Sequence, residues 1–548
     1  MVSTNATAGR VAVIGNGPVG QTAALLLARW GIPVTLLDAR PERDLVGSKA
    51  ICQQRDVLDI WDAVGVGRRV AEEGLTWTTA RTFYRDHELF AYTLDDPGQS
   101  CFPPFVNISQ SRTEELLDER IAGQELIETR WAHEVVGIEQ DGTGVRLRCA
   151  TPAGTVELPA DYALACAGAT GREVRRALGV TFSGHSFEDR FLICDIRASL
   201  PGWSHERRFY FDPEWNPGRQ VLIHPCPGST FRIDWQVPSD YDLEAEEAGG
   251  ALDERIRAII GERPYEIVWN SVYRFHSRVV DRMRAGRVLL AGDCAHLFAP
   301  FGARGLNSGV ADVENAAWKL ALVLRGWAGE ELLESYHAER HAAALENLDV
   351  TTATMDFLVP HTEQQQRTRL DVLERAVHDR TAHAEVNSGR LAEPYWYVDS
   401  PLTTPDRRRP FAGRPPRGST PPAGPGILVP DVPVSAPEAG ASRLRELARD
   451  GFLLLAGQGT DPAMARDAAA GATAGPVRVL ELPTIDPDGT VRRALGARAD
   501  EVWVIRPDAH TAAVLTEPRH ADVAAALGRA AGAGDGVAAR GHDTRERA

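Results

Sequence analysis

The stretch that most constrains the fold is RVAVIGNGPVGQTAALLLARWGIPVTLLDAR, residues 10 to 40. It predicts a buried strand, a glycine turn, a helix and a second strand, because continuous apolar strands are typical of parallel sheets covered on both faces. Gly15, Gly17 and Gly20 follow the GxGxxG spacing, and Asp38 ends the second strand. Such glycines admit a pyrophosphate at the helix N-terminus, and the carboxylate can accept hydrogen bonds from a ribose. We therefore expect a dinucleotide site, and a tight turn without a ligand is the simpler alternative.

Composition limits the classes of protein that remain. The chain has 548 residues, more than one core can organise, so we expect two to four domains. The net charge of −16 argues against a nucleic-acid partner. The seven cysteines are scattered without metal-ligand spacing, so neither a disulfide framework nor a metal site is expected. No signal peptide and no apolar run of about 18 residues is found, which predicts a cytoplasmic protein without a membrane partner.

The pattern of strands and helices indicates that one domain interrupts another. Strand-like stretches between 186 and 279 lack long helices, which favours an antiparallel sheet. A parallel-type strand then returns at 286–293, followed by a helix from about 307 to 326. We expect a discontinuous nucleotide-binding domain, 1–185 and 280–395 with a helical extension, around a sheet domain, 186–279.

The remaining third of the chain changes character. Residues 396–431 are rich in Pro, Gly and Arg and predict an extended linker. Beyond it, strands alternate with helices over 432–532, which indicates a small α/β unit. The stretch 533–548 is predicted to be a disordered tail.

The stretch GDCAHLFAPFGARGLNSG, residues 292 to 309, is nearly free of bulky side chains. Asp293 follows a buried strand, at the edge where open α/β sheets bind ligands. Pro300, Gly305 and Asn307 lead into a helix whose N-terminal amides stabilise negative charge, for example on a reduced flavin ring. The alternative is a glycine-rich helix entry without a ligand.

Several stretches, taken together, carry a family resemblance. They are VAVIGNGPVGQTAALLLARWG, GSKAICQQRDVLDIWDAVGVG, SQSRTEELLDERI, ACAGATGREVRRALGV, the run from YRFHSRVV to WKLALVL, and ESYHAERHAAALEN. Over its first 350 residues the chain resembles the class A FAD-dependent aromatic hydroxylases of the p-hydroxybenzoate hydroxylase fold. Within them it is most similar to 3-(3-hydroxyphenyl)propionate and polyketide hydroxylases with a C-terminal thioredoxin-like domain.

The resemblance implies a mixed α/β and α+β fold. A Rossmann-type FAD-binding domain would be interrupted by an antiparallel-sheet substrate domain and followed by a thioredoxin-like domain over 432–532. No cysteine occurs after Cys294, so that last domain cannot exchange thiols and disulfides. It is expected to be a structural or dimer-contact module, which makes a homodimer a further expectation.

The implied activity is that of a single-component flavoprotein monooxygenase. NAD(P)H reduces FAD, O2 forms a flavin C4a-hydroperoxide, and one oxygen atom passes to an aromatic, phenolic or polyketide-derived substrate, as in secondary metabolite biosynthesis. Two alternatives stay open: a Baeyer–Villiger or epoxidising monooxygenase on a polyketide, and a flavin-binding protein with impaired NAD(P)H reduction. A halogenase is disfavoured because no WxWxIP stretch is found.

Carried over by position, the resemblance implies a set of FAD contacts running from the ADP end to the isoalloxazine ring. They are Gly15, Gly17, Gly20, Asp38, Arg40, Lys49, Gln110, Asp293, Gly305, Leu306 and Asn307. Pro300 would line the oxygen-reacting side of the flavin. In the second fingerprint Ala167 replaces the family's aspartate, which either disturbs the handling of the nicotinamide or is a neutral change beside Gly168.

Substrate contacts are expected on the inner face of the interrupting sheet. The candidates are Tyr210, His224, Arg232 and Trp235, with Phe298 from the 292–309 stretch. His224 is the candidate general base for a phenol, since imidazole titrates near neutral pH. The simpler interpretation is that His224 is an ordinary half-buried histidine and that the two aromatic residues belong to the core.

Overall fold

The computed structural model describes residues 9–44, 50–94, 96, 98, 100–416, 419–473 and 475–533. Its first layer is a six-stranded sheet in the order β18-β19-β12-β1-β2-β8, with β1 (Val11–Ile14) fully buried near its centre. The other strands are β2 (Val34–Leu37), β8 (Ile127–Arg130), β12 (Tyr162–Ala165), β18 (Arg284–Ala285) and β19 (Val288–Leu290). All neighbours run parallel except β18 and β19, so the predicted parallel core is confirmed.

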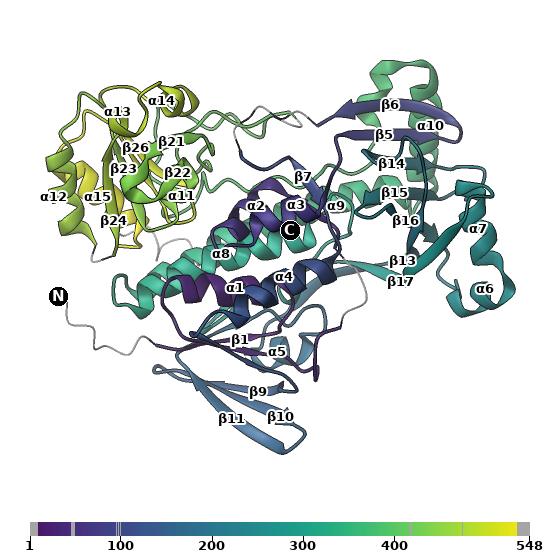
Figure 1. The fold of residues 1–548 in the computed structure, drawn as a ribbon, viewed down its shortest axis with the longest axis horizontal. Coiled ribbons are helices and arrows are strands. Elements are labelled where there is room, and N and C mark those ends of the chain that lie inside the picture. The colour runs from purple at the N-terminus through teal and green to yellow at the C-terminus, as the bar shows by residue number, and fades with distance from the viewer. Residues whose placement is uncertain are drawn as a thin grey trace.

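Helices cover this sheet, with α1 (Pro18–Arg29), α4 (Gln110–Ala122) and α8 (Gly305–Leu324) lying together on one side of it (Figure 1). Helix α1 begins with Pro18 at its first turn, where a missing N–H costs nothing. It packs against α8 and α4, while α5 (Arg172–Ala177) follows β12. The two N-termini of α1 and α8 are therefore brought to the same region of the molecule.

Two small sheets flank this domain. Strands β9 (Glu134–Gln140), β10 (Val145–Thr151) and β11 (Gly154–Ala160) form an antiparallel extension. Strands β3 (Cys52–Gln54), β4 (Leu75–Thr76) and β7 (Phe105–Asn107) form the other, next to helices α2 (Arg55–Asp62) and α3 (Gly67–Glu73).

The interrupting domain is an eight-stranded sheet in the order β20-β17-β13-β16-β15-β14-β5-β6. Its strands are β5 (Thr79–Tyr84), β6 (His87–Thr93), β13 (Phe182–Ala198), β14 (Glu206–Phe211), β15 (Gln220–Cys226), β16 (Thr230–Val237), β17 (Tyr265–Val280) and β20 (His296–Leu297). The antiparallel prediction is correct except that β14 and β5 run parallel. The predicted limits of 186–279 are too narrow, because β5, β6 and β20 join from outside them.

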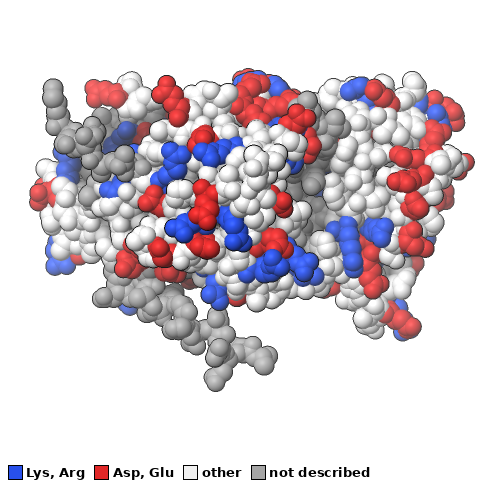
Figure 2. All heavy atoms as spheres, turned by 90° about the horizontal axis from the view of Figure 1, so that it is seen from below, with Lys and Arg blue, Asp and Glu red and all other residues white. Residues whose placement is uncertain are grey.

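The two faces of this sheet have different neighbours. Helices α6 (Leu243–Gly249) and α7 (Ala251–Ile260) cover one face, where Ile233 and Ile256 share a core with other apolar residues. The opposite face turns toward the nucleotide-binding domain. On the surface seen from below, acidic and basic side chains are intermixed, and acidic ones gather at the end that holds α6 and α7 (Figure 2).

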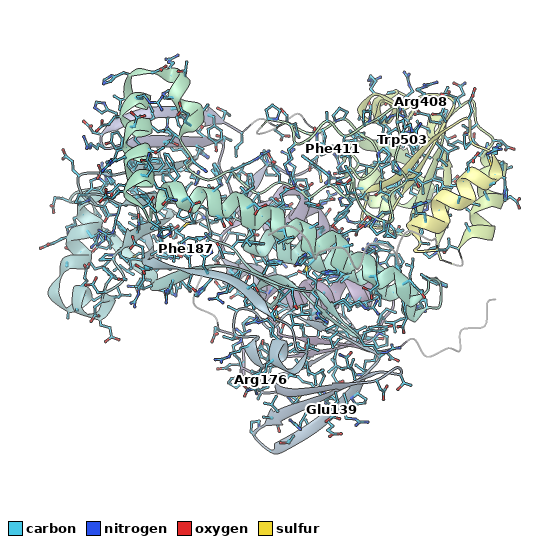
Figure 3. The ribbon with its side chains drawn as sticks, turned by 180° about the vertical axis from the view of Figure 1, so that it is seen from behind. Glu139, Arg176, Phe187, Arg408, Phe411 and Trp503 are labelled. Atoms are coloured by element: carbon cyan, nitrogen blue, oxygen red, sulfur yellow. The ribbon has the colours of Figure 1, made fainter. Side chains whose placement is uncertain are left out.

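Long helices connect the two ends of the molecule. After η1 (Gly292–Cys294) and α8 come η2 (Glu330–Leu333), α9 (Glu334–Leu358), α10 (Glu363–His378) and η3 (Arg380–Glu385). From behind, Phe187 of the large sheet and Trp503 of the C-terminal unit lie at opposite ends, with this helical ribbon between them (Figure 3). None of the described helices combines the length and apolar character needed to cross a bilayer.

The described part of the predicted linker, 396–416 and 419–431, contains no helix or strand beyond an isolated bridge at Leu428. Its second half is not a free connector, since Ile427 and Val429 are buried. The C-terminal unit follows, with a four-stranded sheet in the order β24-β23-β25-β26. Its elements are β21 (Pro433–Ala436), η4 (Pro437–Ala439), β22 (Ala441–Arg443), α11 (Leu444–Ala448), β23 (Phe452–Ala456), α12 (Pro462–Ala472), β24 (Val477–Glu481), α13 (Leu482–Ile485), α14 (Thr490–Leu495), β25 (Glu501–Ile505), β26 (Thr511–Thr516) and α15 (His520–Ala530).

In the C-terminal sheet, β24 runs parallel to β23, whereas β25 and β26 are antiparallel neighbours. This bears out a small α/β unit, and its thioredoxin-like classification stays a prediction. The tail predicted over 533–548 lies outside the described residues apart from Ala533, and Lys49 also lies outside them.

Candidate cofactor and substrate cavity

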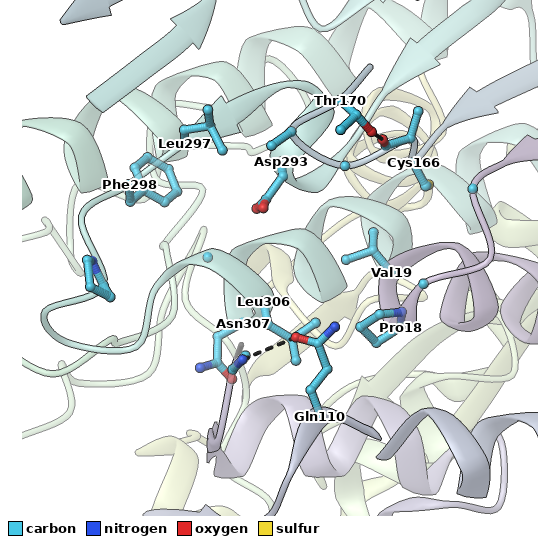
Figure 4. Close-up of a pocket in the computed structure, with 18 of the residues that line it drawn as sticks. Pro18, Val19, Gln110, Cys166, Thr170, Asp293, Leu297, Phe298, Leu306 and Asn307 are labelled. Atoms are coloured by element: carbon cyan, nitrogen blue, oxygen red, sulfur yellow. Dashed lines mark hydrogen bonds between the residues drawn. The ribbon is translucent and has the colours of Figure 1, made fainter. Parts of the chain in front are cut away.

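A cavity of about 790 Å³ lies where the α1 turn, the 292–307 stretch and the inner face of the large sheet meet. Figure 4 shows Asp293 and Gln110 pointing into it from opposite sides. The predicted site residues that line it are Gly15, Gly17, Asp38, Arg40, Gln110, His224, Arg232, Asp293, Phe298, Pro300, Gly305, Leu306 and Asn307. Gly20, Tyr210 and Trp235 do not line it.

The glycines of the α1 turn have distinct reasons to be glycine. Gly15 has a φ of 107°, and a Cβ there would lie 2.3 Å from the carbonyl oxygen of Cys166. A Cβ on Gly20 would lie 1.9 Å from the carbonyl oxygen of Gly15, so Gly20 serves the packing of helix on turn. Around Gly17 nothing lies within 4 Å, and its open face adjoins the cavity. This arrangement fits a pyrophosphate close to the backbone.

Asp38 lies at the far end of β2, 8% exposed. Its Oδ2 accepts from the backbone N of Asn16 at 2.8 Å, and its Oδ1 accepts from Arg40 Nε at 3.0 Å. Burial alone would raise the pKa of this carboxyl, but the hydrogen bonds from Arg40 and Asn16 outweigh it and lower the pKa. The carboxylate is therefore ionised and fixed, as a ribose-binding acceptor needs to be.

The 292–309 stretch is anchored from behind by a buried carboxylate. Asp312 Oδ2 accepts from the backbone N of Gly292 at 3.0 Å and pairs with His296 Nε2 at 2.7 Å. Its Oδ1 accepts from Arg340 Nε at 2.7 Å. Although burial opposes it, the charges of His296 and Arg340 lower the pKa of Asp312 to about 2. Phe298 stacks on the His296 ring with centroids 4.7 Å apart, so the anchor also orients a cavity wall.

Asn307 ties the start of α8 to β3. Its Nδ2 donates to the carbonyl oxygen of Cys52 at 3.0 Å, and its Oδ1 accepts from the backbone N of Gln54 at 3.0 Å. The side chain is thus engaged within the protein, and Gly305, Leu306 and Asn307 of the first turn all line the cavity. Gln110, facing it from α4, accepts from the backbone N of Ala50 at 3.1 Å.

The second fingerprint turn lies directly against the first. Ala167 lines the cavity next to Gly15 and packs on the main core. Two charged residues follow this turn: Glu173 lines the cavity and pairs with Arg176, whereas Arg172 is exposed and lies outside it. A carboxylate therefore remains in the cavity wall, six residues along the chain from position 167.

The inner face of the large sheet carries a row of charged side chains. Strand register places Arg232 opposite both His224 and Asp195, and Arg232 Nε pairs with Asp195 Oδ1 at 2.8 Å. Arg207 of β14 and Asp234 of β16 line the same cavity. These two residues were missed in the sequence, although Asp234 shares the alternation of Arg232.

Tyr210 and Trp235 are on the other face, which corrects the prediction that they contact substrate. Successive residues of a strand point to opposite sides, so Trp235 cannot share a face with Arg232, three positions away. Trp235 is fully buried in the core under α7. Tyr210 stacks on Phe83, with ring centroids 4.6 Å apart.

Burial sets the charge states in this row. It lowers the pKa of His224 well below its usual value, and the nearby Arg207 and Arg232 lower it further. It raises the pKa of Asp234 to about 7, with Arg232 and Arg207 opposing and Asp195 assisting that rise. Asp234 Oδ1 and His224 Nδ1 are buried without a hydrogen-bond partner. The pair thus combines a neutral imidazole with a carboxyl that titrates near neutral pH.

Aromatic rings close the cavity beside this row. Phe191 and Phe275 stack at 4.4 Å, and Phe301 meets Phe191 edge-on at 5.5 Å. All three line the cavity. The site therefore offers an apolar aromatic wall together with a few convergent polar groups, the usual composition of a small-molecule site. Within the described residues, no group of three or more His, Cys, Asp or Glu side chains is arranged to hold a metal ion.

Comparisons with known proteins agree with this geometry. A family model described as an FAD binding domain matches residues 9–351. A flavin-dependent monooxygenase of Mycobacteroides abscessus is 30% identical over 407 residues, covering 70% of this chain and 83% of the relative. A para-nitrophenol 4-monooxygenase of a Pseudomonas species is 28% identical over 375 residues, covering 66% and 90%.

Two solved structures share the fold over 96% of this chain and 99% of their own. One is the flavin-dependent monooxygenase PieE in complex with FAD and substrate, with 24% identity and a TM-score of 0.83. The other is aklavinone-11 hydroxylase with FAD and aklavinone, with 25% identity and a TM-score of 0.75. The chain belongs to the FAD-binding domain family and, within it, to the flavin-dependent aromatic monooxygenases.

Proposed function

We propose that this FAD-dependent monooxygenase uses NAD(P)H and O2 to hydroxylate a phenolic ring of an aromatic or polyketide-derived substrate. One observation carries the proposal: a single cavity joins the glycine-lined nucleotide end to a substrate end with aromatic walls and a carboxyl, Asp234, that titrates near neutral pH. The names of the relatives, which include a nitrophenol monooxygenase and an aklavinone hydroxylase, support a phenolic substrate.

The residues proposed to hold FAD follow the cavity from end to end: Gly15, Gly17, Asp38, Arg40, Gln110, Asp293, Gly305, Leu306 and Asn307. When bound, FAD supplies the redox and oxygen-transfer chemistry that amino-acid side chains lack. Asp38 would accept hydrogen bonds from the ribose, and the first turn of α8 would place backbone amides beside the ring. Pro300 and Phe298 would shape the space in front of it and exclude water.

On the substrate side, Asp234 is the proposed proton acceptor. The phenolic O–H bond breaks, an O–H bond forms on Asp234, and the ring oxygen keeps the electron pair. The positive charge of Arg207 favours the resulting phenolate and reduces the gap between a carboxyl near 7 and a phenol near 10, whereas the charge of Arg232 is balanced by Asp195. The proton returns to an oxygen of the product. His224, predicted as the base, is instead a neutral hydrogen-bonding group in this arrangement.

Three points of the proposal concern partners. The proposal includes both NADH and NADPH as hydride donors, Ala167 either disturbs the handling of the nicotinamide or is a neutral change, and the homodimer stays a prediction. Baeyer–Villiger oxidation or epoxidation of a polyketide is the second candidate, since it needs the same FAD end and differs only in the substrate bound.

Stopped-flow reduction of the FAD-loaded protein tests the proposal. We expect the visible flavin absorbance to bleach within seconds on mixing with NADPH or NADH, and faster with a phenol present. Product analysis under O2 then separates hydroxylation from ring expansion and epoxidation. A flavin that stays oxidised with both nicotinamides would support the alternative of a flavin-binding protein with impaired reduction.

A further inference from the structure

A second cavity, of about 440 Å³, lies beside the first, between the start of α2, the end of β6, the 390–396 segment and the C-terminal unit. We propose that this second cavity is a substrate subsite that receives the distal rings of a multi-ring, oxygenated aromatic substrate whose reacting ring lies in the main cavity. The inference rests on the proposed function and specifies its substrate class.

The two cavities adjoin through a single residue. Leu391 lines both, and its neighbour Ala392 is held in place because its backbone N donates to the carbonyl oxygen of Gly302 at 2.7 Å. Gln54 connects them a second time: it lines the second cavity, and its backbone N donates to the Asn307 side chain at the start of α8. Leu391 and Gln54 thus lie between two neighbouring cavities, and it is part of the inference that a ligand longer than one ring extends past Leu391 from the flavin end.

The walls suit flat, oxygenated rings. Phe105, Tyr92 and Trp396 line the second cavity together with several prolines. Gln54 is 7% exposed, and its Oε1 is buried without a partner. The Nε atoms of Arg55 and Arg390 in the same wall are also buried without partners. Apolar and aromatic surface with a few uncommitted donors and acceptors is typical of small-molecule sites, and it suits flat rings that carry oxygen substituents.

The charges argue against a nucleotide in this space. Arg55 pairs with Asp96 at 3.1 Å, Arg390 with Glu393 at 2.5 Å, and Arg445 with Asp56 at 2.7 Å. Each arginine of the wall is therefore neutralised by a carboxylate, whereas a pyrophosphate needs uncompensated positive charge. The second cavity is electrically balanced, as the neutral rings of a polyketide require.

The size supports a ligand rather than a packing defect. Protein interiors hold few voids larger than a water molecule, and ligand pockets commonly occupy about 300–1,000 Å³, often between domains. The walls of the second cavity come from the nucleotide-binding domain, the end of β6 in the large sheet, the linker, and α11 and α14 of the C-terminal unit. This gives the C-terminal unit a share in the substrate site although it has no cysteine.

The test fills the second cavity from its far side. Ala494 of α14 is half-buried and lines it. Ala494→Trp is compared with Arg492→Trp, an exposed position on the same helix. Dissociation constants for 1,8-dihydroxyanthraquinone and for 4-nitrophenol are measured by calorimetry on the FAD-loaded protein, and reduction by NADPH is followed alongside.

We expect Ala494→Trp to weaken anthraquinone binding at least tenfold and to leave 4-nitrophenol binding, NADPH reduction and the Arg492→Trp control unchanged. The inference is overturned if the wild-type chain does not bind the anthraquinone, if both probes weaken equally, or if neither does. It is equally overturned if only NADPH reduction slows, because the second cavity would then serve the nicotinamide.

Failure of the proposed function has a different signature. A wild-type protein that takes up no FAD, or whose FAD is reduced by neither nicotinamide, contradicts the hydroxylase proposal. Anthraquinone binding to the same preparation still reports on the second cavity by itself.

Discussion

Two buried clusters of charged residues differ in how completely they are satisfied. The docking cluster, Lys319, Glu339, Arg506 and Asp508, joins α8 and α9 to the C-terminal unit. Glu339 accepts from Lys319 Nζ at 2.6 Å and from Arg506 Nη2 at 2.9 Å, and Arg506 also pairs with Asp508 at 2.6 Å. These three side chains, Lys319, Glu339 and Arg506, are fully buried. Every charge in this cluster has an opposite charge in contact with it.

The cavity cluster, Asp195, Arg207, His224, Arg232 and Asp234, is less deeply buried, with Asp234 half-buried at the cavity wall, and its charges are less well balanced. Arg232 is paired with Asp195, whereas Asp234 Oδ1 and His224 Nδ1 have no partner. Buried polar groups that are fully hydrogen-bonded stabilise a unique fold, while partly satisfied ones with shifted pKa values mark functional sites. The comparison assigns the docking cluster to architecture and the cavity cluster to chemistry.

The largest expected effect is the loss of stability on breaking the docking cluster. Glu339→Ala leaves Lys319 and Arg506 without their shared carboxylate. Removing one partner of a buried ion pair costs about 3–5 kcal/mol. We expect a loss of this size in the free energy of unfolding measured with urea. Glu262→Ala, at a side chain 96% exposed, is the control and is expected to change stability by less than about 0.5 kcal/mol.

The second effect separates chemistry from stability. Asp234→Asn removes the proposed proton acceptor, and we expect the hydroxylation rate to fall about 10²- to 10⁴-fold. The urea midpoint should stay the same or rise, because a carboxyl with an unpartnered buried oxygen is lost. Rate and midpoint are measured beside Asp240→Asn, an exposed position of the same domain. A large loss of stability with a normal rate would place Asp234 with the docking cluster.

The third effect concerns pH. The pKa of Asp234 is raised from its usual 3.8 to about 7 in the folded state, so the folded protein keeps a proton that the unfolded chain releases between these values. The free energy of unfolding therefore falls as pH rises from about 4 to about 7, relative to Asp234→Asn, and is level above. Urea titrations of both proteins at pH 5 and pH 8 measure this. A difference between the two proteins that does not change with pH would contradict the assigned pKa.

The smallest effect tests the face assignment. Tyr210→Phe removes a hydroxyl from the side of the sheet away from the cavity, where the ring stacks on Phe83. We expect substrate affinity and turnover to change less than about twofold, because no group in the cavity loses a contact. Steady-state kinetics of the wild-type protein and of Tyr210→Phe measure both quantities. A loss of tenfold or more in either one would show that Tyr210 reaches substrate.

The parts of the molecule that the sequence predicted well are those fixed by local pattern. The β1–α1–β2 unit, Asp38 and the helix after Gly305 each depend on neighbouring residues. The pairing of β14 with β5 could not be predicted, since parallel pairing between distant segments leaves no local signal. Asp234 could have been predicted as a cavity residue, because it is two positions from Arg232 on the same strand. The same alternation places Trp235 on the opposite face. The ion pair of Glu339 with Arg506 joins residues 167 positions apart and forms only when the C-terminal unit packs on α9, so no local pattern predicts it.

The central claim is that Asp234 carries an exchangeable proton near neutral pH beside the substrate. Infrared difference spectroscopy on the FAD-loaded protein detects the carbonyl stretch of a protonated carboxyl directly and needs no substrate. Burial raises the pKa of both Asp234 and Glu314 to about 7, so the account predicts a protonated-carboxyl band that disappears as pH rises through about 7 and loses the Asp234 component in Asp234→Asn. A wild-type spectrum in which no such band titrates between pH 5 and 9, or an Asp234→Asn spectrum in which the titrating band keeps its full wild-type intensity, would contradict it.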